Sequence, residues 1–96
     1  MIDGLSALDL ARVCHVQSEV AQAWLDRTEA PSEAVLGRLR LVLRVMEGLQ
    51  ANGLDDVEDR VEWLRNPNRA FGHEAPIDLL ARGESKPLLD YIDRLS

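Results

Sequence analysis

The sequence predicts an all-α fold of about six helices, on three observations. No segment alternates apolar and polar residues in a β-branched background, as a half-buried strand would. Apolar residues instead recur three and four positions apart in several segments, and the breaks between these segments carry Pro, Gly, Ser or Asn. Only 4% of the residues are aromatic, so the core must be mostly Leu, Val and Ala, which suits packed helices.

Two short helices are expected near the N-terminus. Ser6 and Asp9 resemble a capping box that opens a helix over residues 7–14. Its apolar positions are Leu8, Leu10, Ala11 and Cys14. After a three-residue turn, Ser18 can cap a second helix. One face of this second helix carries Val20, Ala21, Trp24 and Leu25.

The longest helix is expected over residues 32–50. Pro31 and Ser32 open it, and Asn52-Gly53 ends it, with the glycine as a left-handed cap. Its apolar positions are Val35, Leu36, Leu39, Val42, Leu43, Val45, Met46 and Leu49. We therefore expect an N-terminal unit over residues 1–52 that includes this helix, followed by a C-terminal unit over residues 53–96.

Three more helices are expected in the C-terminal unit. Asp55 and Asp56 begin the first, because the helix dipole favours negative charge at its N-terminal end. It carries Val57, Val61, Trp63 and Leu64 and stops at Asn66-Pro67. The second runs from Pro76 to Gly83. The third is capped by Ser85, has Pro87 in its first turn, and carries Leu88, Leu89, Ile92 and Leu95.

The composition narrows the function classes. The net charge is −6, with 11 basic and 17 acidic residues, and such a balance disfavours non-specific binding to nucleic acid. The deficit is larger in the second half of the chain, which makes the first half the better candidate for any DNA contact. The single Cys14 excludes an internal disulfide. Neither a membrane span nor a signal segment is apparent, so we expect a cytoplasmic protein without a membrane partner.

The stretch from Asn66 to Glu84 looks at first like a small active site. It holds two prolines and two glycines around an aromatic residue, a histidine and acids, and His73-Glu74 lies near Asp78. A thiol–imidazole pair of Cys14 and His15 is the other possibility, but neighbours on a helix point about 100° apart. None of the metalloprotease, dithiol, serine-elbow or phosphate-loop motifs occurs. We expect no catalytic residues, no metal and no cofactor.

Residues 8–25 resemble the helix-turn-helix of Xre/Cro-like regulators. Ala11 stands where a small residue lets the two helices cross, and Cys14, Val16, Ala21 and Trp24 stand at positions that should be buried. His15 occupies the turn position, where the family usually has a glycine with positive φ. The resemblance implies that residues 8–25 contact operator DNA.

The DNA-contacting residues that this resemblance implies are few. They are Arg12, Gln17, Ser18, Gln22 and Arg27. The exposed face of the second helix also carries Glu19 and Asp26 but no Lys or Arg, although a Gln can read adenine. Two interpretations stay open: genuine operator binding, or a helix-turn-helix that serves as a scaffold or dimerisation unit.

Residues 62–96 resemble the toxin-binding domain of Xre, MbcA and ParS antitoxins. Nine positions match the family pattern in order and spacing: Trp63, Pro67, Asn68, Phe71, Gly72, Pro76, Leu79, Leu80 and Gly83. Local chemistry fits the pattern, because Pro67 stops one helix, Asn68 can cap a new turn, and Gly72 lets the backbone reverse. Trp63 and Phe71 can pack beneath this turn. The sequence thus predicts a rigid recognition corner.

The resemblance implies an antitoxin of a type II toxin–antitoxin pair. The usual partner is a RES-domain toxin, which resembles ADP-ribosyltransferases; the antitoxin covers its NAD site and represses the shared operon. The toxin-binding residues would be Asn66, Pro67, Asn68, Arg69, Phe71, His73, Glu74, Lys86, Tyr91, Arg94 and Ser96. An acidic C-terminal half would suit a basic NAD pocket. Such a protein is not an enzyme.

The assembly expected from the resemblance is a homodimer or a toxin–antitoxin hetero-oligomer. Two other functions remain open. The chain could act as a stand-alone helix-turn-helix transcriptional regulator without a toxin, or as an orphan scaffold whose corner binds some other partner.

Overall fold

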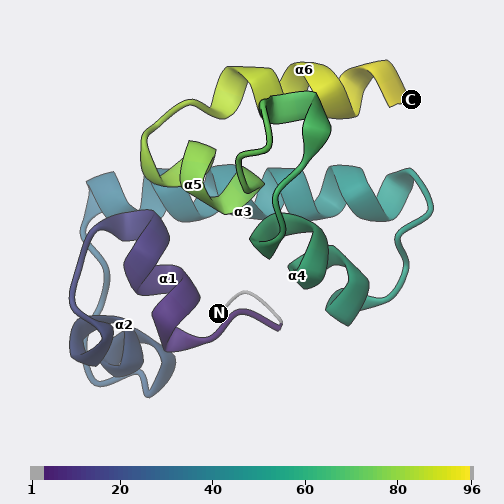
Figure 1. Cartoon of the computed structure of the whole chain (residues 1–96). Coiled ribbons are helices and arrows are strands. Elements are labelled where there is room, and N and C mark those ends of the chain that lie inside the picture. Colours follow the sequence, from purple (N-terminus) through teal and green to yellow (C-terminus); the bar gives the residue numbers. More distant parts are fainter. Residues whose placement is uncertain (1–3, 96) are drawn as a thin grey trace.

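The computed structural model describes residues 4–95, which form six α-helices and no strand. The helices are α1 (Ala7–Cys14), α2 (Ser18–Leu25), α3 (Glu33–Ala51), α4 (Val57–Arg65), α5 (Pro76–Ala81) and α6 (Ser85–Leu95) (Figure 1). A single 3₁₀ turn, η1 (Arg69–Phe71), lies between α4 and α5. The all-α prediction is confirmed. Of the helices in residues 4–95, none has the length and apolar character that crossing a membrane requires.

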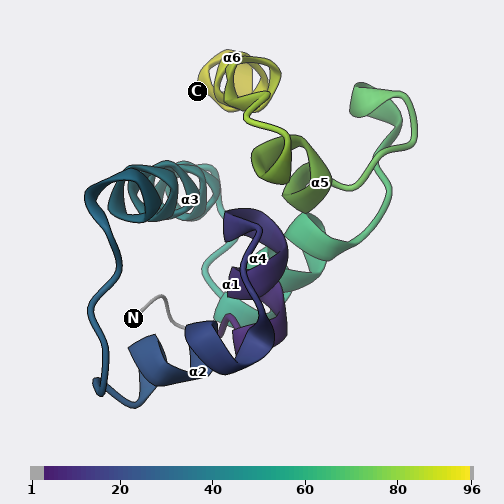
Figure 2. The same ribbon diagram turned by 90° about the vertical axis from the view of Figure 1, so that its left-hand side faces the viewer.

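The short helix α5 occupies the centre of the molecule. It contacts α1, α3, α4 and α6, while α6 also runs along the long helix α3 (Figures 1 and 2). Its Ile77, Leu79 and Leu80 are buried in one hydrophobic cluster that draws side chains from all six helices. This core is continuous across the junction between residues 52 and 53. The division into units 1–52 and 53–96 stays a prediction.

Most of the predicted helix ends agree with the structure. Ser6 and Asp9 form the capping box of α1, and the Ser32 side chain accepts from the Val35 amide. Asp56 caps α4 by accepting from Glu58, and Gly53 has the left-handed conformation with φ 103°. Each cap satisfies a backbone group that the first or last turn of a helix leaves without a partner.

Two predicted caps are wrong by one residue. Ser18 is the first residue of α2 instead of its cap, because the Gln17 carbonyl already accepts from the amides of Val20 and Ala21. Gln17 makes no side-chain cap bond in that position. Ser85 is likewise the first residue of α6. Pro87 does lie in the first turn of that helix, as predicted.

Three leucines of the predicted apolar faces lie on the surface. Leu8 is 72% exposed, Leu43 is 45% exposed, and Leu95, the last residue of α6, is 50% exposed. Leu8 precedes the buried Leu10 by two positions, about 200° around the helix, and Leu43 follows the buried Val42 by one position, about 100° around it. The apolar stripe of α1 and that of α3 that pack into the core are therefore narrower than the apolar pattern of the sequence suggests.

The turn between α1 and α2 has the expected geometry. His15 is left-handed, with φ 56° and ψ 45°, where a glycine is more usual. Cys14, Ala21 and Trp24 are buried as predicted, whereas Ala11 and Val16 are only half-buried. The His15 ring also donates from Nε2 to the carbonyl of Ala81, at the end of α5. This contact ties the turn to the central helix.

Two arginines connect α1 to the rest of the fold. Arg38 on α3 donates to the carbonyls of Val13 and Ala81, at 3.1 and 2.9 Å, and so joins the C-terminal ends of α1 and α5. A cation is favoured there because the dipoles of both helices end in partial negative charge. Arg65 on α4 makes two hydrogen bonds to the Asp9 carboxylate, one from Nε at 3.0 Å.

Candidate functional site

The corner, residues 66–74, is a closed loop held by its own backbone and one side chain. The Asn68 side chain accepts from the Ala70 amide at 2.9 Å, which caps η1. The Asn68 amide donates to the Glu74 carbonyl at 3.1 Å, and the His73 amide donates to the Asn68 carbonyl at 3.0 Å. Gly72 and His73 take left-handed conformations that reverse the chain. The corner projects away from α3 at the side of α5 (Figure 2).

Three of the four aromatic residues of the chain meet beneath the corner. The Trp63 ring on α4 lies edge-on to Phe71, with centroids 6.0 Å apart, and stacks on Tyr91 of α6 at 6.2 Å. Phe71 and Tyr91 are 5.3 Å apart. Such pairs add to the stability that burial provides. The cluster joins α4, η1 and α6, and the contact of Trp63 with Phe71 agrees with the prediction that these two residues pack beneath the corner.

Trp63 is half-buried. A fully buried tryptophan would do no more than fill the core, but this ring reaches the surface beside the corner. The stacking of Trp63 on Tyr91 was not apparent from the sequence, because the two residues are far apart in the chain.

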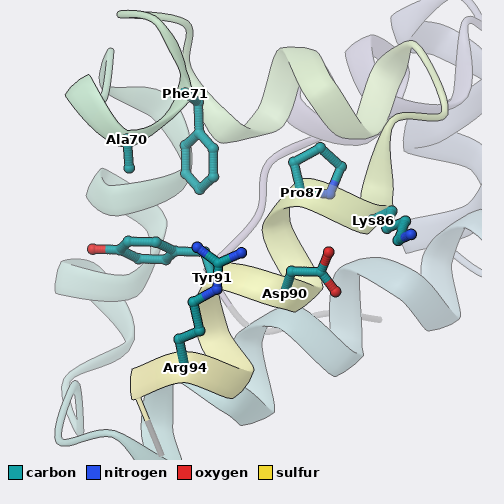
Figure 3. A pocket seen from close by; sticks show the side chains of 7 residues that line it. All are labelled: Ala70, Phe71, Lys86, Pro87, Asp90, Tyr91 and Arg94. Carbon is teal, nitrogen blue, oxygen red and sulfur yellow. The ribbon is translucent and has the colours of Figure 1, made fainter.

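A cavity of about 340 Å³ opens between η1 and α6. Its lining residues are Ala70, Phe71, Lys86, Pro87, Asp90, Tyr91 and Arg94 (Figure 3). Phe71 and Tyr91 belong to the aromatic cluster, so their contacts with each other and with Trp63 hold the walls of the cavity in place. We call this feature the η1–α6 pocket.

The structure brings four predicted toxin-binding residues together in this pocket: Phe71, Lys86, Tyr91 and Arg94. The sequence analysis missed Ala70, Pro87 and Asp90. A helical signal could have found two of them, since Pro87 lies four positions before Tyr91 and Asp90 lies four positions after Lys86.

The charges around the pocket lack partners within residues 4–95. Lys86, Asp90 and Arg94 are exposed and make no ion pair with another described residue. They follow one another at intervals of four, so their side chains alternate in sign along one stripe of α6. The pocket carries two cations and one anion, so its net charge is positive, whereas the C-terminal half as a whole has a negative net charge. The expectation of an acidic contact surface does not hold at this place.

The other predicted toxin-binding residues lie around the corner. Asn66, Pro67, Arg69 and His73 are exposed on its outside, and Asn68 is half-buried by its bonds within the loop. Glu74 is exposed but pairs with Arg82, which also contacts Glu84 at 3.0 Å. The hydrogen bonds that Arg82 donates to the two acids raise its pKa, so it stays charged. Ser96 lies outside the described residues.

The acids near His73 have basic partners. Glu74 pairs with Arg82, and Asp78 pairs with Arg12 across the contact of α5 with α1. Cys14 is buried, and burial raises the pKa of its thiol. Within residues 4–95, no three His, Cys, Asp or Glu side chains come together as metal ligands.

Of the five predicted DNA-contacting residues, Ser18 and Gln22 line a shallow groove between α1 and α2. Glu19, Asp26 and the exposed Leu8 line the same groove. Gln22 donates from Nε2 to Asp26 Oδ1 at 3.0 Å, so an amide that could read a base is engaged within the helix.

Neither Arg12 nor Arg27 lines this groove. Arg12 is held by Asp78, while Arg27 is exposed in a left-handed conformation and Gln17 is exposed at the turn. The groove itself is lined by two acids and no cation.

Comparison with known proteins identifies one family. Residues 53–96 match the family model of the antitoxin Xre/MbcA/ParS C-terminal toxin-binding domain. The matched segment contains the corner, the aromatic cluster and the η1–α6 pocket. The comparisons found no similar curated protein and no similar solved structure.

Proposed function

Because residues 53–96 match the family model of the antitoxin Xre/MbcA/ParS C-terminal toxin-binding domain, we propose that this chain is the antitoxin of a type II toxin–antitoxin pair. It binds its toxin with the corner and with α6 and has no catalytic role of its own. The observation that carries this proposal is the η1–α6 pocket. Within the matched segment, it combines a preformed aromatic surface with charged side chains that have no partner in the described chain.

A preformed surface favours binding for a physical reason. Association costs free energy when loops and side chains must be ordered, and a rigid surface lowers that cost. The hydrogen bonds within the corner and the packing of Phe71 against Trp63 and Tyr91 order this surface in advance. Aromatic side chains are also common energetic centres of protein interfaces.

The proposed partner is a RES-domain toxin, and the proposed mechanism is occlusion of its NAD site. Both rest on the resemblance of residues 62–96 to toxin-binding domains whose usual partners are such toxins. In this proposal residues 53–96 form the toxin-binding unit and residues 1–52 the second unit. The assembly is a homodimer or a hetero-oligomer with the toxin, in the cytoplasm.

Co-expression with the neighbouring reading frame tests the proposal. We expect a stable complex in which NAD hydrolysis by the toxin is suppressed, with a stoichiometry that light scattering will give. A toxin that hydrolyses NAD at the same rate with and without an excess of the chain would refute inhibition. A chain that stays free of the toxin during purification would refute binding.

Operon autorepression is a second candidate, for residues 1–52. The paired helices α1 and α2 and the left-handed His15 support it, while the acidic groove and the engaged Arg12 and Gln22 weigh against strong DNA binding. Retardation of operator DNA at low salt, lost as salt rises, is the expected result if repression occurs. Operator binding without any toxin partner would instead favour the stand-alone regulator.

A further inference from the structure

We propose that the η1–α6 pocket binds a segment of the toxin that carries an apolar side chain between two carboxylates, one for Lys86 and one for Arg94. This inference rests on the proposed function and adds the chemistry of the partner surface. Three features of the pocket carry it: an apolar floor, two separated cations, and an anion between them.

The floor of the pocket accepts an apolar side chain. Ala70, Phe71, Pro87 and Tyr91 supply apolar surface on both sides of a space of about 340 Å³. This volume is at the lower end of the range of about 300–1,000 Å³ for pockets that bind small molecules, so one or two side chains fill it. Phe71 and Tyr91 are fixed by each other and by Trp63, which keeps the space open before the partner arrives.

The two cations are far enough apart to meet two separate carboxylates. Lys86 and Arg94 both line the pocket and lie eight residues apart on α6 (Figure 3). With a rise of 1.5 Å per residue, their Cα atoms are about 12 Å apart. Neither cation pairs with an acid within residues 4–95, so a partner carboxylate would not have to displace an existing ion pair.

Asp90 excludes a third carboxylate between the other two. It lies four residues from each cation and lines the same pocket without an ion pair. An acid placed over Asp90 would be repelled, whereas an apolar side chain that enters the pocket would avoid this repulsion. The stripe on α6 therefore favours the order acid, apolar residue, acid.

The test compares two charge reversals of equal size. Lys86→Glu with Arg94→Glu changes the pocket, and Arg40→Glu with Arg44→Glu changes two exposed arginines on α3 that do not line it. Each double variant changes the net charge by the same amount. Affinity for the neighbouring-gene toxin is measured by calorimetry at several salt concentrations, and circular dichroism establishes that each variant is folded.

We expect the pocket variant to bind at least about 30-fold more weakly, because two charge-assisted contacts become repulsive. Because salt screens this repulsion, the affinity of the pocket variant should rise with salt concentration, whereas that of the unaltered chain should fall. The α3 variant should stay within about threefold of the unaltered chain. A third variant, Ala70→Leu, should weaken binding by filling the space while leaving the charges unchanged.

Each contrary result has a distinct meaning. If the unaltered chain binds the toxin and both double variants bind equally well, the inference is wrong and the proposed function stands. If Ala70→Leu binds as tightly as the unaltered chain, no side chain enters the pocket and the inference is again wrong. If the unaltered chain does not bind the toxin, the proposed function fails, and this inference with it.

Discussion

The contact of Asp9 with Arg65 offers the most direct test of how α1 is attached to α4, within the segment 53–96. The Asp9 carboxylate accepts from the Ser6 amide at 3.0 Å, from the Ser6 hydroxyl at 3.1 Å, and twice from Arg65. Its side chain is 10% exposed and that of Arg65 is 44% exposed. Replacing Asp9 with alanine removes the carboxylate and with it all four of these hydrogen bonds.

The cost of Asp9→Ala follows from these contacts. Loss of half of a capping box costs about 1 kcal/mol. Charge-assisted hydrogen bonds to a largely buried carboxylate contribute about 1.5–3 kcal/mol, and this value must be reduced because water screens the half-exposed Arg65. We expect the free energy of unfolding to fall by about 2–3 kcal/mol. For a domain of this size the melting temperature then falls by roughly 10–20 °C.

The pH dependence of the stability loss shows how much of it comes from the charged carboxylate of Asp9 and how much from its methylene group. Burial by itself raises the pKa of Asp9, but the hydrogen bonds from Arg65 and Ser6 outweigh it, and the net pKa is lowered. A lowered folded pKa stabilises the fold above the unfolded value of about 4 and loses that contribution as pH falls further. The difference between the unaltered chain and Asp9→Ala should thus be full at pH 7 and shrink from about pH 5 downward.

Urea unfolding followed by circular dichroism at pH 7 and pH 3 measures both quantities. Glu47→Ala is the matched control, because Glu47 is an exposed acid in the middle of α3 and should change stability by less than about 0.5 kcal/mol. A loss at Asp9 no larger than at Glu47, or a loss that is the same at both pH values, would refute the reasoning. A double-mutant cycle with Arg65→Ala then isolates the pair.

Three further predictions concern other parts of the molecule. Gly37→Ala should stabilise the fold by up to about 1 kcal/mol, because nothing lies near the new methyl group. Gly48→Ala should destabilise it by about 1–2 kcal/mol, because its Cβ would lie 2.5 Å from Ile92 Cγ2. Urea unfolding measures both changes, and equal effects would contradict the close contact of α3 with α6. Cys14 should react with a thiol reagent at least about tenfold more slowly in the native chain than in urea, since it is buried with a raised pKa; equal rates would show that the site opens. Arg69→Glu should weaken toxin binding with no change in helicity, and unchanged affinity would remove Arg69 from the interface.

The sequence predicts the helices well because their signals are local. Ser6 with Asp9, Ser32, and Asn52-Gly53 are caps that act within one turn, and the structure has them where they were expected. The left-handed turn at His15 was expected from the resemblance to Xre/Cro-like regulators, which usually have a glycine with positive φ there.

The contacts that place the helices against one another were not predictable. Arg65 meets Asp9 across 56 positions of the chain, and Arg38 meets Ala81 across 43. Both arginines would look like ordinary surface cations in a helical pattern. No single-sequence signal pairs such distant residues, since the pairing depends on how the helices pack.

The candidate site was only partly predictable, because some of its parts are local in the chain and others depend on how the helices pack. The corner is a local structure of Pro, Asn and Gly, so its position and its reversal at Gly72 follow from the sequence. The η1–α6 pocket depends on the packing of η1 against α6, so its apolar floor and the missing partners of Lys86 and Arg94 emerge only in three dimensions. The acidic composition of the C-terminal half even suggested the opposite local charge.

The central claim is that the corner and α6 bind a toxin, and calorimetric titration of the unaltered chain into the neighbouring-gene toxin tests it most directly. We expect a saturable, high-affinity complex that is at least about 30-fold weaker for Lys86→Glu with Arg94→Glu and nearly unchanged for Arg40→Glu with Arg44→Glu. An unaltered chain that gives no binding heat and leaves the NAD hydrolysis of the toxin unchanged would contradict the account.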